Sequence, residues 1–194
     1  SLKALDVIAA RYADSVRHGL CDAVAWDPTP LRYACRRATF TRERHETSDL
    51  RRLLAEKETV LKRDGASDED ADVRMATVYV HALRRLIARV EGGDDIHATT
   101  ELQGLRLGAL ALLGSPFETF QRIKNDVVAK APGLVTLVMG ITNDCLGYAP
   151  DAETSERGGY AAKQVPFMLG ELPYADIHRE LVDGLTGIAE ALQD

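Results

Sequence analysis

The chain has 194 residues, of which 45% are apolar and 28% are charged. This is the composition of a soluble globular protein with one sizeable core. The net charge of −6 argues against nucleic acid as a partner, because an anionic surface repels phosphate backbones. No apolar run is long enough to span a bilayer, so we expect no transmembrane segment. The three scattered cysteines, Cys21, Cys35 and Cys145, predict buried reduced thiols rather than a disulfide framework.

The first half of the chain is predominantly helical in pattern. Apolar residues at helical spacing predict an amphipathic helix over about residues 2–19: Leu5, Ile8, Tyr12 and Val16. Residues 31–41 have the pattern of a strand. Two further helices follow, which we expect to form a helical hairpin inserted at 48–91. The first is predicted to be capped by Ser48 and the second by a capping box at Ser67.

The second half changes to a mixed pattern. Residues 96–113 predict a β-hairpin whose second strand is buried. Ser115 as the N-cap and Pro116 as the first helical residue predict a helix, which Pro132-Gly133 ends. Phe117, Phe120, Ile123, Val127 and Ala131 would form its inner face. The apolar, β-branched stretch 134–141 predicts a strand of the buried kind.

A long loop rich in Gly, Pro and Asn is predicted from residue 142 to about 170, and loops of this length are often functional. A C-terminal helix is predicted over 173–193. The fold class is therefore α/β, with α+β as the other option, and has a central mixed sheet flanked by helices. Few strands for so many helices favours a half-domain, part of a larger one, over a complete single domain. The N-terminus lacks the regions of a signal peptide and has no initiator Met, which also suggests a fragment or a processed chain.

Residues that could carry chemistry gather in the segment 96–165. Glu118 follows an apolar strand and could act as a metal ligand or a base, although it also fits the N3 position of the capping box. Tyr148 follows the next strand; a nearby cation can make a phenol a ligand, and packing under its own loop is the alternative. Tyr160 follows two glycines, a pattern that also fits a turn followed by an anchoring ring. Asn143 fits an Asx turn.

The five histidines show no metal-ligand spacing such as HxH or HxxxH. Glycine-rich phosphate loops and a nucleophile elbow are also absent from the sequence. The chain thus offers at most two zinc-type ligands, Glu118 and Tyr148. A catalytic zinc needs about three protein ligands plus water.

Three sequence runs resemble the catalytic domain of neutral/alkaline (non-lysosomal) ceramidases. They are LRLGALALLGSPFETF, GITNDCLGYAP and ERGGY, and the resemblance covers roughly residues 102–165. It implies hydrolysis of the amide bond of ceramide-like lipids at a single zinc, by attack of a zinc-bound water. By position, Glu118 matches that family's carboxylate zinc ligand and Tyr148 its tyrosine ligand. Tyr160 matches a tyrosine that supports the oxyanion, and Asn143 matches the loop asparagine.

Two departures limit what the resemblance implies. Cys145 stands where the family's loop has its first tyrosine. The family's two zinc histidines and its site serine lie upstream of this region, and nothing in this chain matches them. The chain therefore resembles the C-terminal half of the catalytic domain and is expected to be inactive alone. Self-association, or pairing with the missing N-terminal half, is expected.

Two readings from other classes stay open. The absent histidines favour a non-catalytic α/β binding or interaction module. A helical interaction protein organised by the hairpin at 48–91 is the third reading.

Overall fold

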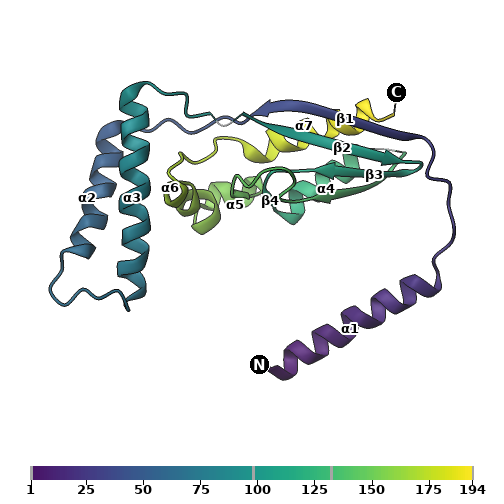
Figure 1. Cartoon of the computed structure of the whole chain (residues 1–194), viewed down its shortest axis with the longest axis horizontal. Helices are drawn as coiled ribbons and strands as arrows, with labels where there is room; N and C mark the ends of the chain where they lie inside the picture. Colours follow the sequence, from purple (N-terminus) through teal and green to yellow (C-terminus); the bar gives the residue numbers. More distant parts are fainter. Residues whose placement is uncertain (1, 98, 132, 194) are drawn as a thin grey trace.

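The computed structural model of the chain describes residues 2–97, 99–131 and 133–193. A mixed four-stranded sheet has the order β1-β2-β3-β5 and runs through the body of the molecule (Figure 1). Its strands are β1 (Leu31–Thr39), β2 (Thr99–Leu107), β3 (Leu110–Gly114) and β5 (Val135–Met139). The first three pair antiparallel, whereas β3 and β5 are parallel. The predicted class, a mixed sheet flanked by helices, is confirmed.

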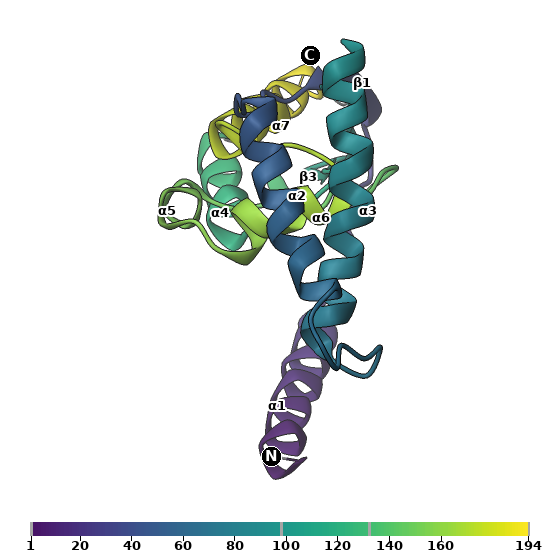
Figure 2. The same ribbon diagram turned by 90° about the vertical axis from the view of Figure 1, so that its left-hand side faces the viewer.

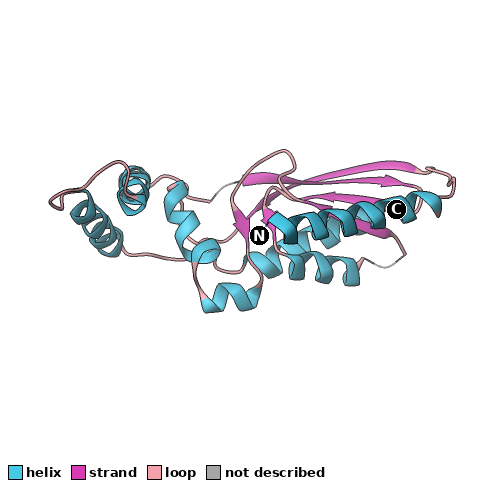
Figure 3. Cartoon of the chain, turned by 90° about the horizontal axis from the view of Figure 1, so that it is seen from below, coloured by secondary structure: helices cyan, strands magenta, loops and turns pink. Residues whose placement is uncertain are grey.

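Two helices cover one face of this sheet. They are α4 (Gln121–Lys130) and α7 (Ile177–Ala191); Figure 3 shows the strands as one layer with helices on one side of it. The core between the layers is apolar and fully buried: Leu102, Leu113, Ile123, Val127, Leu181 and Leu185. Helix α7 approaches β2 closely, since a Cβ added at Gly104 would lie 2.5 Å from Ile188 Cγ2.

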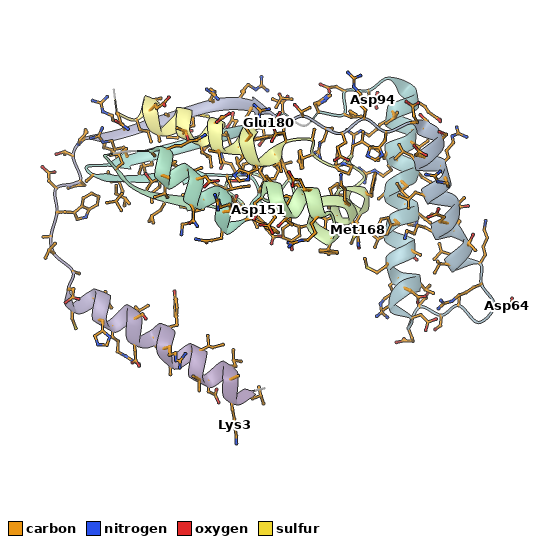
Figure 4. All side chains as sticks on the ribbon, turned by 180° about the vertical axis from the view of Figure 1, so that it is seen from behind. Lys3, Asp64, Asp94, Asp151, Met168 and Glu180 are labelled. Atoms are coloured by element: carbon orange, nitrogen blue, oxygen red, sulfur yellow. The ribbon has the colours of Figure 1, made fainter. Side chains whose placement is uncertain are left out.

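A second, smaller core holds the helical hairpin. Helices α2 (Thr47–Leu61) and α3 (Ala71–Gly92) run side by side, as Figure 2 shows. Together with Leu172, from the segment before α7, they form a buried apolar cluster: Leu50, Tyr79, Leu83, Leu86 and Ile87. Met168 lies on the side of the body that faces this hairpin (Figure 4).

The predicted helix caps of the hairpin are wrong. Glu46 and Asp70 occupy the N-cap positions, and neither makes a side-chain capping bond. Ser48 lies inside α2, and the Ser67 hydroxyl accepts from the Glu69 N–H in a turn before α3. Ser and Asp serve turns as readily as caps, so the local pattern fits both. Helix α3 ends at Gly93, which has a left-handed φ of 75°.

Helix α1 (Leu2–Cys21) forms where it was predicted, yet none of its residues is buried. Its apolar stripe is exposed to solvent: Leu5, Ile8, Tyr12 and Val16. In Figures 1 and 4 the helix extends away from the body. The chain between α1 and β1 is held at the sheet, where the Gly108 N–H donates to the Pro30 carbonyl at 3.0 Å.

Four other expectations need correction. The predicted helix does not begin at Pro116, because α4 starts at Gln121; Pro132, in its predicted end, lies outside the described residues. Strand β5 is not buried on both faces, since Val135, Leu137 and Met139 are exposed. The stretch 142–170 is not a long loop: it contains β6 (Tyr148–Ala149), α5 (Ala152–Arg157), a π-helical turn η1 (Tyr160–Gln164) and α6 (Val165–Leu169). The cysteines are free, as predicted, but exposed.

Candidate functional site

Glu118 and Tyr148 are brought together by a two-stranded parallel sheet. Strand β4 (Glu118–Thr119) pairs with β6, and the two residues are direct partners in the register. The Glu118 N–H donates to the Gly147 carbonyl at 2.9 Å, and the Phe120 N–H donates to the Ala149 carbonyl at 3.0 Å. The capping-box interpretation of Glu118 is therefore wrong, and its carboxylate is free to serve a site instead.

The turn that carries Glu118 is fixed from inside the protein. Ser115 is buried, and its hydroxyl bonds the Thr119 hydroxyl at 2.8 Å and accepts from the Phe117 N–H at 3.3 Å. A Cβ added at Gly140 would lie 2.8 Å from the Phe117 carbonyl oxygen. The two segments can therefore meet only because residue 140 is glycine. The polar Ser115 thus closes a turn rather than beginning a helix.

Backbone strain lies in the loop between β5 and β6. Ile141 has a φ of 51° and Asn143 a φ of 64°. Asn tolerates the left-handed region, but a β-branched residue there is an outlier. The surroundings enforce it, because the Ile141 N–H donates to the Phe117 carbonyl at 3.1 Å and the Thr142 N–H to the Ser115 carbonyl at 2.8 Å. Strain of this kind gathers at functional sites.

The Tyr148 phenol interacts directly with the Glu118 carboxylate. The pKa of Tyr148 is raised above its ordinary value, first by the charge of Glu118, then by burial and by the hydrogen bond to Glu118. In the free protein the phenol therefore keeps its proton. A cation placed between the two oxygens would replace that proton and would favour the phenolate.

Tyr160 completes a cluster with Tyr148. Their ring centroids lie 6.3 Å apart at an interplanar angle of 62°. The backbone before Tyr160 needs glycine, since Gly158 has a φ of 73° and Gly159 a φ of 106°. Tyr160 then begins the π-helical turn η1, a rare element often found at functional sites. Its side chain is exposed, so the phenol is accessible to a ligand.

Phe120 forms a further wall of the cluster that the sequence did not reveal. Its ring lies edge-on to Tyr148, with centroids 6.2 Å apart. It was predicted to lie on the inner face of a helix, but it is the N-cap residue of α4 instead. Only the pairing of β4 with β6 shows this role.

Asn143 lies elsewhere. It lines a polar cavity with Arg37 and Glu101, and its predicted supporting role in the site remains a prediction. The neighbouring Asp144 bonds the backbone of its own loop, since its Oδ1 accepts from the Cys145 N–H at 2.8 Å. Its other carboxylate oxygen accepts from the Thr100 hydroxyl at 3.1 Å.

An apolar groove of ≈ 600 Å³ lies between the hairpin and the segment that follows Tyr160. Its apolar lining includes Leu53, Val60, Met75, Tyr79 and Phe167. The groove reaches the π-helical turn η1, since Lys163 and Gln164 also line it and the Tyr79 hydroxyl donates to the Gln164 carbonyl at 3.5 Å.

The described residues contain no group of three or more His, Cys, Asp or Glu side chains that could hold a metal ion. Glu118 and Tyr148 together supply two oxygen donors, half of a tetrahedral shell. Two of the histidines serve other contacts: His178 accepts from the Ala152 N–H at 2.9 Å and bonds Asp126 at 2.9 Å, and His97 lies against Asp95. Among the described helices, none is both long enough and apolar enough to cross a membrane.

The chain was compared with family models, curated proteins and solved structures. No family model and no curated protein matches the sequence. The crystal structure of neutral ceramidase from Pseudomonas aeruginosa is similar at 25% identity and a TM-score of 0.35, over 49% of this chain and 16% of that one. A ceramidase complexed with C2 is similar at 25% identity and a TM-score of 0.35, over 48% of this chain and 15% of that one. The similarity thus spans about half of this chain and a small part of those proteins.

Proposed function

We propose that this chain carries half of the active site of a ceramidase-like, zinc-dependent amidohydrolase that cleaves the amide bond of ceramide-like lipids. The observation that carries the proposal is the pairing of Glu118 with Tyr148 beside Tyr160. These three residues are the ones that the sequence resemblance assigns to the metal and the oxyanion, and they lie 30 and 12 positions apart along the chain. The β4–β6 pair and the two-glycine turn bring them together.

In this proposal Glu118 and Tyr148 hold a zinc ion, which when bound supplies a Lewis acid and an activated water. Two donors are too few for a catalytic zinc, so the remaining ligands come from another polypeptide segment. The isolated chain is therefore inactive. The phenol of Tyr160 donates a hydrogen bond to the carbonyl oxygen of the amide as negative charge develops there. In the metal-free chain the carboxylate of Glu118 orients the phenol of Tyr148.

The apolar groove lined by Met75, Tyr79 and Phe167 fits the lipid part of the substrate. Most of its lining is aliphatic or aromatic, and an acyl chain gains about 0.8 kcal/mol for each CH₂ group that it buries. The groove and the tyrosine cluster together match a molecule with one polar, cleavable group and a long apolar chain.

The test is metal binding by the full chain, with cobalt(II) as a spectroscopic substitute for zinc and isothermal titration with zinc beside it. Added imidazole supplies the missing ligands. We expect the parent to bind in the presence of imidazole, and Glu118→Gln and Tyr148→Phe each to lose that binding. Binding should tighten as pH rises, because the metal must displace the phenol proton of Tyr148.

Glu101→Gln and Tyr33→Phe are matched controls, since both residues lie on the sheet and not in the cluster. Unchanged binding in both controls, with loss in both site variants, supports the proposal. Equal binding in all five proteins would place the metal elsewhere and reject Glu118 and Tyr148 as ligands.

A second candidate is a non-catalytic α/β binding or interaction module. It is favoured by the finding that the described residues contain no group of three or more His, Cys, Asp or Glu side chains that could hold a metal ion. This function predicts no metal binding at any imidazole concentration. It also predicts that a lipid amide or fatty acid binds the apolar groove equally well in the parent and in Glu118→Gln.

A further inference from the structure

Helix α5 lies between Tyr148 and Tyr160 in the chain and packs little apolar surface of its own. None of its residues is buried, and Figure 2 shows it at the outer edge of the body. Its side-chain capping bond is internal, because the Asp151 carboxylate accepts from the Thr154 N–H at 2.8 Å. The position of α5 therefore depends on polar contacts with the rest of the protein.

A histidine of α7 holds the first turn of α5. The Ala152 N–H is one of the donors that a helix start leaves without an intrahelical partner, and it donates to His178 Nδ1 at 2.9 Å. The other ring nitrogen, Nε2, bonds Asp126 Oδ2 of α4 at 2.9 Å. The imidazole thus links α4, α5 and α7, and its side chain is only 17% exposed.

These two contacts fix the protonation state in which His178 can hold α5. A backbone N–H only donates, so Nδ1 is the unprotonated nitrogen and the proton of the neutral ring lies on Nε2, toward Asp126. A proton on Nδ1 would set one N–H against the N–H of Ala152 and end that hydrogen bond. The charged ring would keep its contact with Asp126, which then becomes an ion pair. Protonation therefore releases α5 and leaves α4 bound.

Two cavities reach the imidazole. A polar cavity of ≈ 370 Å³ has Glu156, Lys163 and His178 in its lining. A second cavity, of ≈ 410 Å³, has Asp126, Ala152 and His178 in its lining. Water in these cavities can exchange protons with the ring, and α5 has room to move away from α7.

We infer that His178 is a positioning residue, which in its neutral form holds α5 and thereby sets where Tyr160 lies relative to Tyr148. The pairing of β4 with β6 fixes Tyr148 independently. Tyr160 instead follows Gly158 and Gly159, whose positive φ values mark a flexible connection to α5. The consequence for catalysis rests on the proposed function, in which Tyr160 supports the oxyanion, whereas the positioning itself needs no metal.

Other charged groups surround His178 on every element packed against it. They are Asp126, Arg122 and Lys130 on α4, Asp151 and Glu156 at α5, Asp176 and Arg179 at α7, Lys163 on η1, and Glu43 after β1. Carboxylates ordinarily titrate near pH 4 and amines near pH 10, so histidine is the side-chain type that changes charge between about pH 5 and 8. His45, which bonds Glu43 at 3.3 Å, is a second histidine near this group and stays unchanged in every variant below.

Nuclear magnetic resonance of the isotope-labelled, metal-free full chain between about pH 5 and 8 tests the inference. In the parent, the ring nitrogen shifts of His178 should show a protonated Nε2 and an unprotonated Nδ1 at the upper end of this range. The Tyr160 ring resonances should change with the same midpoint as the His178 ring. Loss of one hydrogen bond should lower the ratio of held to released α5 about tenfold, so the Overhauser contact between Tyr148 and Tyr160 should weaken as pH falls.

Two variants separate the roles of the two ring nitrogens. His178→Asn keeps an acceptor near the Nδ1 position and cannot titrate, so Tyr160 should keep its high-pH resonances throughout. His178→Gln keeps a donor toward Asp126 and loses the acceptor, so Tyr160 should show the released state at every pH. His97→Asn is the matched control, since His97 also contacts an aspartate, Asp95, at 3.2 Å; it should titrate like the parent.

Several results would overturn the inference. They are Tyr160 resonances that stay constant while the His178 ring titrates, a proton on Nδ1 at the upper end of the pH range, and parent-like Tyr160 resonances in His178→Gln. A full Tyr160 titration in His178→Asn would assign the effect to another group and also overturn it. The parent titration decides even where a variant fails to fold. Because no readout involves zinc, failure here leaves metal binding by Glu118 and Tyr148 standing, and failure of metal binding leaves this positioning standing.

Discussion

Replacing Phe117 tests whether the aromatic core beneath the site holds the Glu118 turn. The ring of Phe117 is fully buried. It packs edge-to-face with Phe40 at 5.0 Å and with Tyr174 at 5.4 Å between ring centroids. Its carbonyl also accepts from the strained Ile141 N–H. Phe117 therefore connects the main core to both segments that form the site.

The expected cost of Phe117→Ala follows from these contacts. Truncating a buried Phe costs about 3–5 kcal/mol of unfolding free energy through lost transfer energy and the remaining cavity. For a chain of this length each kcal/mol lowers Tm by about 2–4 °C, so the melting temperature should fall by about 6–20 °C. In a double-mutant cycle with Phe40→Ala, the pair should show a coupling of about 0.5–1.5 kcal/mol.

Urea unfolding and calorimetry measure both quantities. Leu169→Ala is the control, because Leu169 is 50% exposed and its truncation should cost less than about 0.5 kcal/mol. A loss below about 1 kcal/mol for Phe117→Ala, with no coupling to Phe40, would refute the view that this three-ring cluster supports the site.

Three further predictions concern titration and dynamics. Glu118→Gln should move the pKa of Tyr148 down toward its ordinary value, since the charge of Glu118 is the largest cause of the rise; tyrosine ring resonances report it, and an unchanged pKa would contradict the contact. Burial raises the pKa of Tyr174 to about 12, so its contribution to stability is complete below about pH 10 and is lost as pH rises through 12. The free energy of unfolding should fall by about 3 kcal/mol over this pH range. Urea unfolding of Tyr174→Phe should show a shallower decline of that free energy, and a decline identical to that of the parent would contradict the raised pKa of Tyr174. Amides of α1 (Leu2–Cys21) should exchange with deuterium far faster than those of α7, because α1 buries nothing; equal protection would show that α1 is packed.

The sequence by itself determined those features that depend on neighbouring residues. Helical periodicity located α1, α3 and α7. Glycine at position 93 ended α3, because that position has a positive φ. The alternating stretch before Gly108 predicted the β2–β3 hairpin. The sequence also singled out Glu118, Tyr148 and Tyr160, although their joint role came from a resemblance and not from spacing.

The tertiary structure decided what depends on residues far apart in the chain. Ser115, Pro116 and Glu118 satisfy the local pattern of a helix start, yet hydrogen bonds to the segment 139–149 draw them into a turn and a strand instead. Strand β5 has the composition of a buried strand, but burial depends on whether a second layer packs against it, and none of the described helices does. Local sequence favours one conformation for each segment, whereas pairing and burial depend on all the segments that meet there.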